Sequence, residues 1–370
     1  MVDYLLNFLG KELGKSNFMI YGGIRRLSVK NHENISHLEG VPNFELTDID
    51  LNDPHSIRDA VIDLQPDYFI NFAAQSFVAG SWKYPVQTWG TDADAVLHIL
   101  ESIRRFMPEC RFYNAGSSEE FGDVVYSPQD ENHPLNPQSP YGAAKCAARH
   151  LVRVYRESYK LFAIQGWLFN HEGVRRGLDF VTRKISHGIA KIKISLDNGN
   201  TPTSSFPVLR LGNLDAFRDW SDAEDFMEGV WLMLTQEKPN QFILASGEMH
   251  SIREFLEECL RLSGINWGQR GTGPSEEFFD KDSGLTIVKI DKKFYRPAEV
   301  HELCGNPSLA EKELGWKRKT DFKALVSKMY FNDLASFCVG SPAIGKSITS
   351  PGVNSWGEST GVTLFHKKNC

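Results

Sequence analysis

The first half of the chain alternates short, nearly continuous apolar runs with segments in which apolar residues recur every three or four positions. Such runs are typical of buried strands, and the wider spacing is typical of amphipathic helices. The pattern predicts strands at 18–24, 44–51, 67–73, 110–116 and 161–170, alternating with helices at 2–14, 54–64, 91–106 and 139–159. Apolar strands that alternate with helices form a parallel sheet covered on both faces. We therefore expect an α/β fold with a doubly wound parallel sheet.

Local signals define several element ends. Asp53 and Pro54 predict the start of the second helix, because a proline at the first helical position loses no intrahelical hydrogen bond. Gly14 suits the left-handed residue that often follows a helix. Ser251 and Glu254 have the spacing of a capping box in front of an apolar run. These signals predict where the elements begin and end, independently of the hydrophobic pattern.

Beyond about residue 170 the regular alternation weakens. Helices are predicted at 180–192, 223–234, 251–262 and 308–316, separated by short strands and by loops rich in Gly, Pro and Asn. The end of the chain is rich in Gly, Ser, Pro and Thr and has no periodicity, which favours disorder. We predict a first domain at 1–169, a smaller mixed α/β lobe at 170–337 that is partly interleaved with it, and a disordered tail at 338–370.

Composition narrows the function classes. The chain has 370 residues, of which 41% are hydrophobic and 24% charged, and its net charge is −6. This charge gives no reason to expect nucleic acid or an acidic membrane as a partner. Six scattered cysteines without a CxxC favour neither a disulfide framework nor a metal site. No apolar run approaches the roughly 20 residues of a membrane span. We therefore expect a cytoplasmic protein without nucleic-acid, membrane or metal partners.

Candidate chemistry lies around residues 117–145. Tyr141 and Lys145 share one helix face, and an ammonium beside a phenol lowers the phenol's pKa, so that it can take a proton from a hydroxyl. Ser117 follows a buried strand, at the edge where ligands bind in open α/β sheets. Glu119 could remove a proton next to a carbonyl. The alternatives are an exposed Tyr–Lys pair, a turn serine and a solvated loop carboxylate, and the last is our interpretation of Glu120.

These residues lie in two segments, NAGSSEEFG (114–122) and SPYGAAK (139–145), that resemble the active-site segments of extended short-chain dehydrogenase/reductases, and among them those of GDP-mannose 4,6-dehydratases. The likeness covers roughly residues 3–335. It continues through NFAAQS (71–76), LFNHEGVRRGLDFVTRKI (168–185), LGNLDAFRDWSDAEDF (211–226), FILASGEMHSIREF (242–255) and FYRPAEV (294–300).

The resemblance implies a lyase that converts GDP-mannose to GDP-4-keto-6-deoxymannose, towards GDP-fucose or another GDP-deoxyhexose. NADP would carry a hydride from carbon 4 to carbon 6 of the mannose. Tyr141 would take the proton of the 4-hydroxyl, with Ser117 and Lys145 as its partners, and Glu119 would remove the proton on carbon 5 before water leaves. Relatives of this kind are homo-oligomers.

The resemblance also implies binding residues. The first domain would be Rossmann-like and hold NADP through Arg25, Arg26, Ser28, Asp50, Leu51, Asn71, Ala73, Ala74, Gln75, Tyr141, Lys145, His171 and Arg176. The second lobe would hold the GDP-sugar through Asn170, Arg175, Lys184, Arg210, Arg218, Arg296 and Glu299, because arginine pairs bidentately with phosphate. An ion pair between Arg218 and Asp219 is the structural alternative for that arginine.

One departure concerns the start of the fold. The family begins with a strand and a glycine-rich turn whose amides bind the pyrophosphate at a helix N-terminus. Residues 2–13 align instead with the helix after that turn, so we expect the sheet to lack its central first strand. Two alternatives to the dehydratase therefore stay open. One is a related nucleotide-sugar epimerase or reductase, and the other is a catalytically impaired, truncated subunit.

Overall fold

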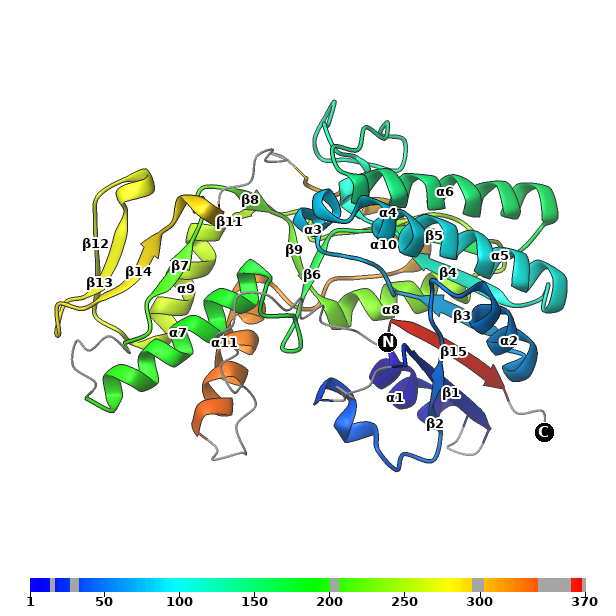
Figure 1. Ribbon diagram of the computed structural model, residues 1–370, viewed down its shortest axis with the longest axis horizontal. Helices are drawn as coiled ribbons and strands as arrows, with labels where there is room; N and C mark the ends of the chain where they lie inside the picture. The colour runs from blue at the N-terminus through cyan, green and yellow to red at the C-terminus, as the bar shows by residue number, and fades with distance from the viewer. Residues whose placement is uncertain (14–16, 27–32, 200–205, 295–302, 339–360, 368–370) are drawn as a thin grey trace.

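The computed structural model describes residues 1–13, 17–26, 33–199, 206–294, 303–338 and 361–367. Its larger domain is built on a seven-stranded sheet (Figure 1). In spatial order the strands are β10 (Ile243–Leu244), β5 (Ala163–Leu168), β4 (Arg111–Ala115), β3 (Tyr68–Asn71), β15 (Val362–Lys367), β1 (Phe18–Ile24) and β2 (Phe44–Asp48). All neighbouring pairs are parallel except the two that involve β15. The predicted doubly wound α/β fold is confirmed.

Helices cover both faces of this sheet. On one face, α2 (Pro54–Leu64), α5 (Ala95–Phe106) and α6 (Pro140–Tyr159) share a hydrophobic core with the strands. On the other face, α1 (Val2–Glu12) and α8 (Ala223–Leu234) share a second core. The Asp53 side chain accepts a hydrogen bond from the His55 amide at the start of α2, as predicted. Gly14 lies outside the described residues. Within the described part of the chain, no helix is long and apolar enough to cross a membrane.

The central strand corrects two of our predictions, namely that residues 361–367 belong to a disordered tail and that the central position of the sheet is vacant. Instead, β15 runs antiparallel between β3 and β1, with Leu364 opposite Phe69 on one side and Tyr21 on the other. Val362, Leu364 and Phe365 are buried, so the strand is apolar on both faces. The polar composition of the residues before it hides this short run of β-prone side chains in the sequence.

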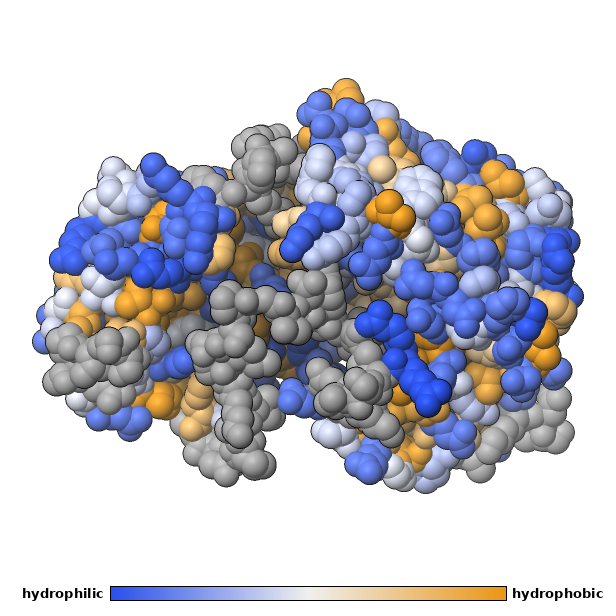
Figure 2. Space-filling model, in the orientation of Figure 1, coloured by the Kyte–Doolittle hydropathy of each residue, from blue (hydrophilic) through white to orange (hydrophobic). Residues whose placement is uncertain are grey.

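The smaller lobe has its own sheet and core. Its strands, in the order β12 (Trp267–Arg270), β13 (Glu277–Asp280), β14 (Thr286–Ile290) and β7 (Leu209–Leu211), pack with α7 (Val181–Asp197), α9 (Ile252–Ser263) and α11 (Phe322–Cys338). Ser251 and Glu254 form the predicted capping box at the start of α9. In Figure 2, hydrophilic and hydrophobic residues are interspersed on the visible face of both lobes.

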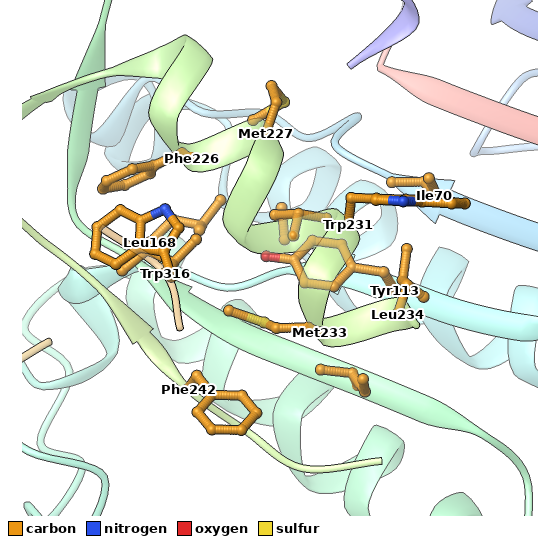
Figure 3. Close-up of a cluster of buried hydrophobic side chains, with 14 of the residues drawn as sticks. Ile70, Tyr113, Leu168, Phe226, Met227, Trp231, Met233, Leu234, Phe242 and Trp316 are labelled. Carbon is orange, nitrogen blue, oxygen red and sulfur yellow. The ribbon is translucent and has the colours of Figure 1, made fainter. Parts of the chain in front are cut away.

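The two lobes are interleaved in sequence. Figure 3 shows Trp231 and Met233 of α8 beside Tyr113 of β4. Phe226 of the same helix lies close to Trp316. Trp316, which follows α10 (Ser308–Leu314), enters the same cluster and donates a hydrogen bond to the Asp225 carbonyl. Residues from the second half of the sequence therefore complete the first domain's core, and the domain limit at 169/170 remains a prediction.

The remaining elements are short. They are the α-helices α3 (Val78–Lys83) and α4 (Pro85–Trp89), the π-helical turn Gly90–Asp94 ahead of α5, the 3₁₀ turns Glu33–Leu38, Ser118–Glu120, Gly273–Ser275 and Lys292–Phe294, and the strands β6 (Asn170–Glu172), β8 (Phe217–Arg218), β9 (Trp220–Asp222) and β11 (His250–Ser251).

Candidate active site

Ser117, Tyr141 and Lys145 are brought together where β4 ends and α6 begins. Ser117 follows β4 and caps the 3₁₀ turn 118–120. Tyr141 lies in the first turn of α6, which begins at Pro140 after the N-cap Ser139. The Tyr141 phenol thus belongs to the N-terminus of α6, where the positive end of the helix dipole stabilises a negative charge.

The Tyr–Lys pair is buried. Tyr141 is 8% exposed and Lys145 is 2% exposed, which excludes the alternative of an exposed surface pair. The Lys145 ammonium donates a hydrogen bond to the Ala115 carbonyl (3.1 Å) and lies 5.8 Å from the centre of the Tyr141 ring. The side chain of Ser117, itself 8% exposed, is hydrogen-bonded to the Tyr141 phenol. The three side chains thus share one enclosed site.

The direction of the Tyr141 pKa differs from our prediction. Burial raises the pKa of this phenol, and the Asp92, Glu119 and Glu120 carboxylates raise it further. The hydrogen bond with Ser117 acts in the opposite sense. The expected net lowering by Lys145 is therefore wrong for this structure, because the cost of burying a phenolate dominates.

Glu119 and Glu120 lie in different environments although they are neighbours. Glu119 is half-buried, its amide donates to the Ser117 hydroxyl (3.2 Å), and its carboxylate interacts electrostatically with the Tyr141 phenol. Glu120 is fully buried and accepts hydrogen bonds from the Ser117 amide (2.8 Å) and from Arg149 (3.2 Å to Oε1). Our interpretation of Glu120 as a solvated carboxylate is therefore wrong.

A ladder of buried polar side chains fixes this carboxylate. Asn71 of β3 donates to Asn114 of β4 (2.8 Å), and Asn114 donates to Gln165 of β5 (2.7 Å). Gln165 in turn donates to Glu120 (3.1 Å) and to the Lys145 carbonyl (2.9 Å). The first three residues stand in register on adjacent strands. Three amides at matching positions of apolar strands are a signal in the sequence that we did not use.

The predicted cofactor residues lie mainly beyond the carboxyl ends of parallel strands. Arg25 and Arg26 are exposed after β1, and Asp50 and Leu51 follow β2. Asn71 ends β3, and Ala73, Ala74 and Gln75 follow it. Gln75 also stabilises this loop, because its side-chain amide donates a hydrogen bond to the Thr88 hydroxyl and accepts one from the Phe77 backbone amide. His171 and Arg176 lie in and after β6, and Arg176 pairs with Glu172 (3.2 Å). Ser28 lies outside the described residues.

The predicted substrate residues come from the junction with the smaller lobe. Arg175 is exposed and paired with Asp3 (2.7 Å), and the Lys184 ammonium lies 3.6 Å from the centre of the Phe294 ring. Burial lowers the pKa of Lys184. Asn170 is in β6, Arg210 in β7 lies 3.7 Å from Asp291, and Arg218 in β8 donates to the Phe217 carbonyl. Arg296 and Glu299 lie outside the described residues.

Asp219 has backbone partners. This buried carboxylate accepts hydrogen bonds from Ser246 (2.7 Å, amide), Gly247 (3.1 Å) and Gly305 (3.1 Å). Burial nevertheless raises its pKa. These bonds hold three loops together beside Arg218, and the alternative of an ion pair between Arg218 and Asp219 remains a prediction.

Only part of the site suits a nicotinamide dinucleotide. The Tyr141 phenol, the Ser117 hydroxyl and the Lys145 ammonium suit a nicotinamide ribose, and the guanidinium groups after β1 suit a phosphate. Between these ends, the Gly361 carbonyl accepts a hydrogen bond from the Phe72 amide (2.5 Å), and a Cβ atom on Gly361 would lie 2.4 Å from the Ala73 Cα. The entry to β15 thus packs on Ala73, and no glycine-rich turn lies there among the described residues. The two ends fit the cofactor, and the pyrophosphate position does not.

Proteins of known function resemble this chain over most of its length. The family model of GDP-mannose 4,6 dehydratase matches residues 4–329. The chain is 39% identical over 345 residues to GDP-mannose 4,6-dehydratase of Vibrio cholerae, covering 89% of this chain and 90% of that protein. It is 37% identical over 336 residues to the human GDP-mannose 4,6 dehydratase, covering 89% and 88% of the two chains.

Solved structures with low sequence identity share the fold. RMD from Pseudomonas aeruginosa complexed with NADPH has a TM-score of 0.66 at 20% identity, covering 85% of this chain and 99% of that one. DesIV, a dTDP-glucose 4,6-dehydratase from Streptomyces venezuelae with NAD and TYD bound, has a TM-score of 0.70 at 18% identity, covering 91% and 94%. The match of the family model over most of the sequence shows that this chain belongs to the GDP-mannose 4,6-dehydratase family.

Proposed function

We propose that this chain is a hydro-lyase that converts GDP-mannose to GDP-4-keto-6-deoxymannose and water. The observation that carries the proposal is the half-buried Glu119, whose amide donates to the Ser117 hydroxyl and whose carboxylate interacts electrostatically with the buried Tyr141 phenol. An epimerase needs the phenol, the hydroxyl and the ammonium, but it needs no carboxylate at this place. The family match over residues 4–329 supports the same substrate.

Each side chain has a separate task in this proposal. The Tyr141 phenolate takes the proton of the sugar 4-hydroxyl, while the Ser117 hydroxyl donates a hydrogen bond to the same oxygen. Lys145 keeps a positive charge beside the ring, which offsets the cost of forming a phenolate in a buried site. Once a ketone stands at carbon 4, the proton on carbon 5 is acidic. Glu119 removes this proton and passes it to the carbon 6 hydroxyl, which leaves as water. A bound nicotinamide would take up the hydride from carbon 4 and return it at carbon 6.

The finer parts of the proposal rest on fewer residues. We propose NADP, because Arg25 and Arg26 are exposed after β1 and arginine suits a 2′-phosphate. Asn170, Arg175, Lys184, Arg210 and Arg218, with Arg296 and Glu299, are the proposed GDP-sugar residues. The resemblance to the family supports a cytoplasmic homo-oligomer whose product leads to GDP-fucose or another GDP-deoxyhexose.

One observation favours a second candidate, a family member with little or no catalytic activity. The antiparallel strand β15 stands where the family has its first strand, and its entry packs on Ala73 at the proposed pyrophosphate position. Losing the charge-assisted hydrogen bonds of that turn, at about 1.5–3 kcal/mol each, weakens dinucleotide binding by orders of magnitude.

The test uses the purified full chain with GDP-mannose and either NADP or NAD, followed by mass spectrometry. A product lighter by one water supports the dehydratase, and isomerisation without loss of water indicates an epimerase. Glu119→Gln serves as the matched control, because it keeps the size of the side chain and removes the base. Absence of any product at saturating dinucleotide, with GDP-mannose still bound in calorimetry, supports the inactive family member.

A further inference from the structure

An arginine in the first turn of α7 anchors the loop at residues 173–180, which joins β6 to α7 and carries Arg175. The guanidinium of Arg183 reaches back to this loop. It donates hydrogen bonds to the backbone carbonyls of Val174 and of Arg176, the second at 3.2 Å. These two carbonyls stand on either side of Arg175. Arg183 therefore fixes the backbone that presents the Arg175 side chain.

The same guanidinium meets a buried carboxylate of α11. Asp333 is fully buried, and its Oδ1 lies 2.7 Å from Nη2 of Arg183. Its Oδ2 accepts a hydrogen bond from the Ser186 hydroxyl (2.5 Å). A buried carboxylate is costly without a cation, so this pair holds Arg183 in one orientation. Because α7 and α11 share the core of the smaller lobe, the loop is tied to a packed unit.

The three acceptors explain why an arginine stands at this position. A guanidinium carries five donors in a planar fork, so that its nitrogens can serve acceptors on different sides. Here Nη2 faces Asp333, while Nη1 bonds the two loop carbonyls. A lysine could keep a charge beside the carboxylate, but its single nitrogen cannot serve both sides. An ion pair that only joined the two helices would not need the bonds to the loop.

Arg175 is presented at the junction of the two lobes. Its side chain is 48% exposed and pairs with Asp3 of α1 (2.7 Å). It also donates to the Asn34 carbonyl (3.2 Å). An exposed guanidinium that holds a carboxylate can pair with a phosphate in the same way. The conformation of the loop therefore decides whether Arg175 can meet an anionic ligand.

We propose that Arg183, held by Asp333, is a positioning residue that presents Arg175 to the diphosphate of the nucleotide sugar. It acts through the backbone of residues 173–180. The anchoring of this loop is a property of the protein alone, and its effect on ligand binding rests on the proposed function.

The anchoring is tested on the full chain without ligand, by hydrogen–deuterium exchange and mass spectrometry of the peptide that covers residues 173–180. The Arg176 and Phe180 amides are hydrogen-bonded within this loop, at 3.0 and 3.1 Å. Arg183→Lys keeps a charge for Asp333 but loses the fork, so we expect the loop amides to exchange about 10-fold faster. Exchange equal to that of the wild type overturns the proposal.

Two controls separate anchoring from stability. Lys191→Arg preserves the charge at an exposed position of α7 and leaves the exchange of the loop unchanged. Exchange within α7 is the internal reference in each variant and stays at the wild-type rate. If Arg183→Lys does not fold, the double variant Arg183→Met, Asp333→Leu decides by the same criterion, because a buried ion pair can often be replaced by apolar side chains.

The effect on the ligand is a separate readout, the calorimetric binding of GDP. We expect Arg183→Lys to raise the Kd for GDP by about 10-fold, because Arg175 must then be ordered before it can pair with the diphosphate. In turnover, the same change raises KM for GDP-mannose and leaves kcat within about two-fold, since the contact is made equally in the bound substrate and in the transition state.

An equal Kd for Arg183→Lys and the wild type contradicts the role in presenting Arg175. If the wild type binds no GDP, the proposed function fails, and the exchange experiment still decides whether Arg183 anchors the loop.

Discussion

Phe365 offers a direct test of the central strand. Its side chain is fully buried in the core between the sheet and α8, with ring centres 5.3 Å from Tyr68, 6.1 Å from Phe18 and 6.2 Å from Trp231. Phe365→Ala removes contacts to three aromatic rings and leaves a cavity that a sheet pinned on both sides cannot close. A change of this kind in a core costs about 3–5 kcal/mol. That is a large part of the roughly 5–15 kcal/mol by which domains are stable.

The assay is urea-induced unfolding of the full chain, followed by tryptophan fluorescence, because Trp231 lies in the same cluster. Phe106→Ala is the matched control: Phe106 ends α5 and is 44% exposed, so its loss changes the free energy of unfolding by less than about 0.5 kcal/mol. If Phe365→Ala and Phe106→Ala have the same unfolding midpoint and slope, β15 does not hold the centre of the sheet and the reasoning is refuted.

Three further predictions follow from the site. Glu119→Gln permits oxidation at carbon 4 but blocks loss of water, and Tyr141→Phe blocks both steps. Cofactor absorbance measures the oxidation, and the mass of the product measures the loss of water. Reduction of the cofactor by Tyr141→Phe would contradict the role of the phenol as the base for the first oxidation. Arg149→Met leaves the buried Glu120 carboxylate without its cation and destabilises the protein by about 3–5 kcal/mol. Arg153 is exposed on the same helix, so the control Arg153→Met changes the free energy of unfolding little. Equal stability of the two variants in urea contradicts the buried pair. Folding raises the Asp92 pKa from 3.8 to about 6, so the wild type loses stability as the pH rises through that interval. Between pH 4 and pH 7 the free energy of unfolding of Asp92→Asn therefore rises by about 3 kcal/mol relative to that of the wild type. A difference between the two proteins that does not change with pH refutes the shift.

The larger features of the fold could be predicted because each depends on local pattern. Apolar strands and amphipathic helices of the first half are readable from spacing, and the ends at Asp53 and Ser251 follow from capping chemistry. The strand β15 was missed because its six residues pair with β1 and β3, which lie far away in the sequence. No local signal says where an isolated apolar run will pair.

In the site, too, the positions of some residues could be predicted and their environments could not. Tyr141, Lys145 and Ser117 were predicted to meet, and they do, since a strand end and the next helix start are neighbours in this fold. The environment of each charge was not predictable. Glu119 and Glu120 look alike in sequence, yet Glu120 is buried by Arg149 of α6 and Gln165 of β5. Burial of this kind is set by packing between distant elements, and it decided the sign of the Tyr141 pKa shift as well.

The most direct test of the proposed reaction follows one hydrogen atom. The full chain is incubated with GDP-mannose deuterated at carbon 4, and the product is analysed by deuterium NMR. If Tyr141 and Glu119 act in one enclosed site, the deuterium is found on carbon 6 of a product that has lost water. Deuterium released to solvent, or retained on carbon 4, would contradict the account.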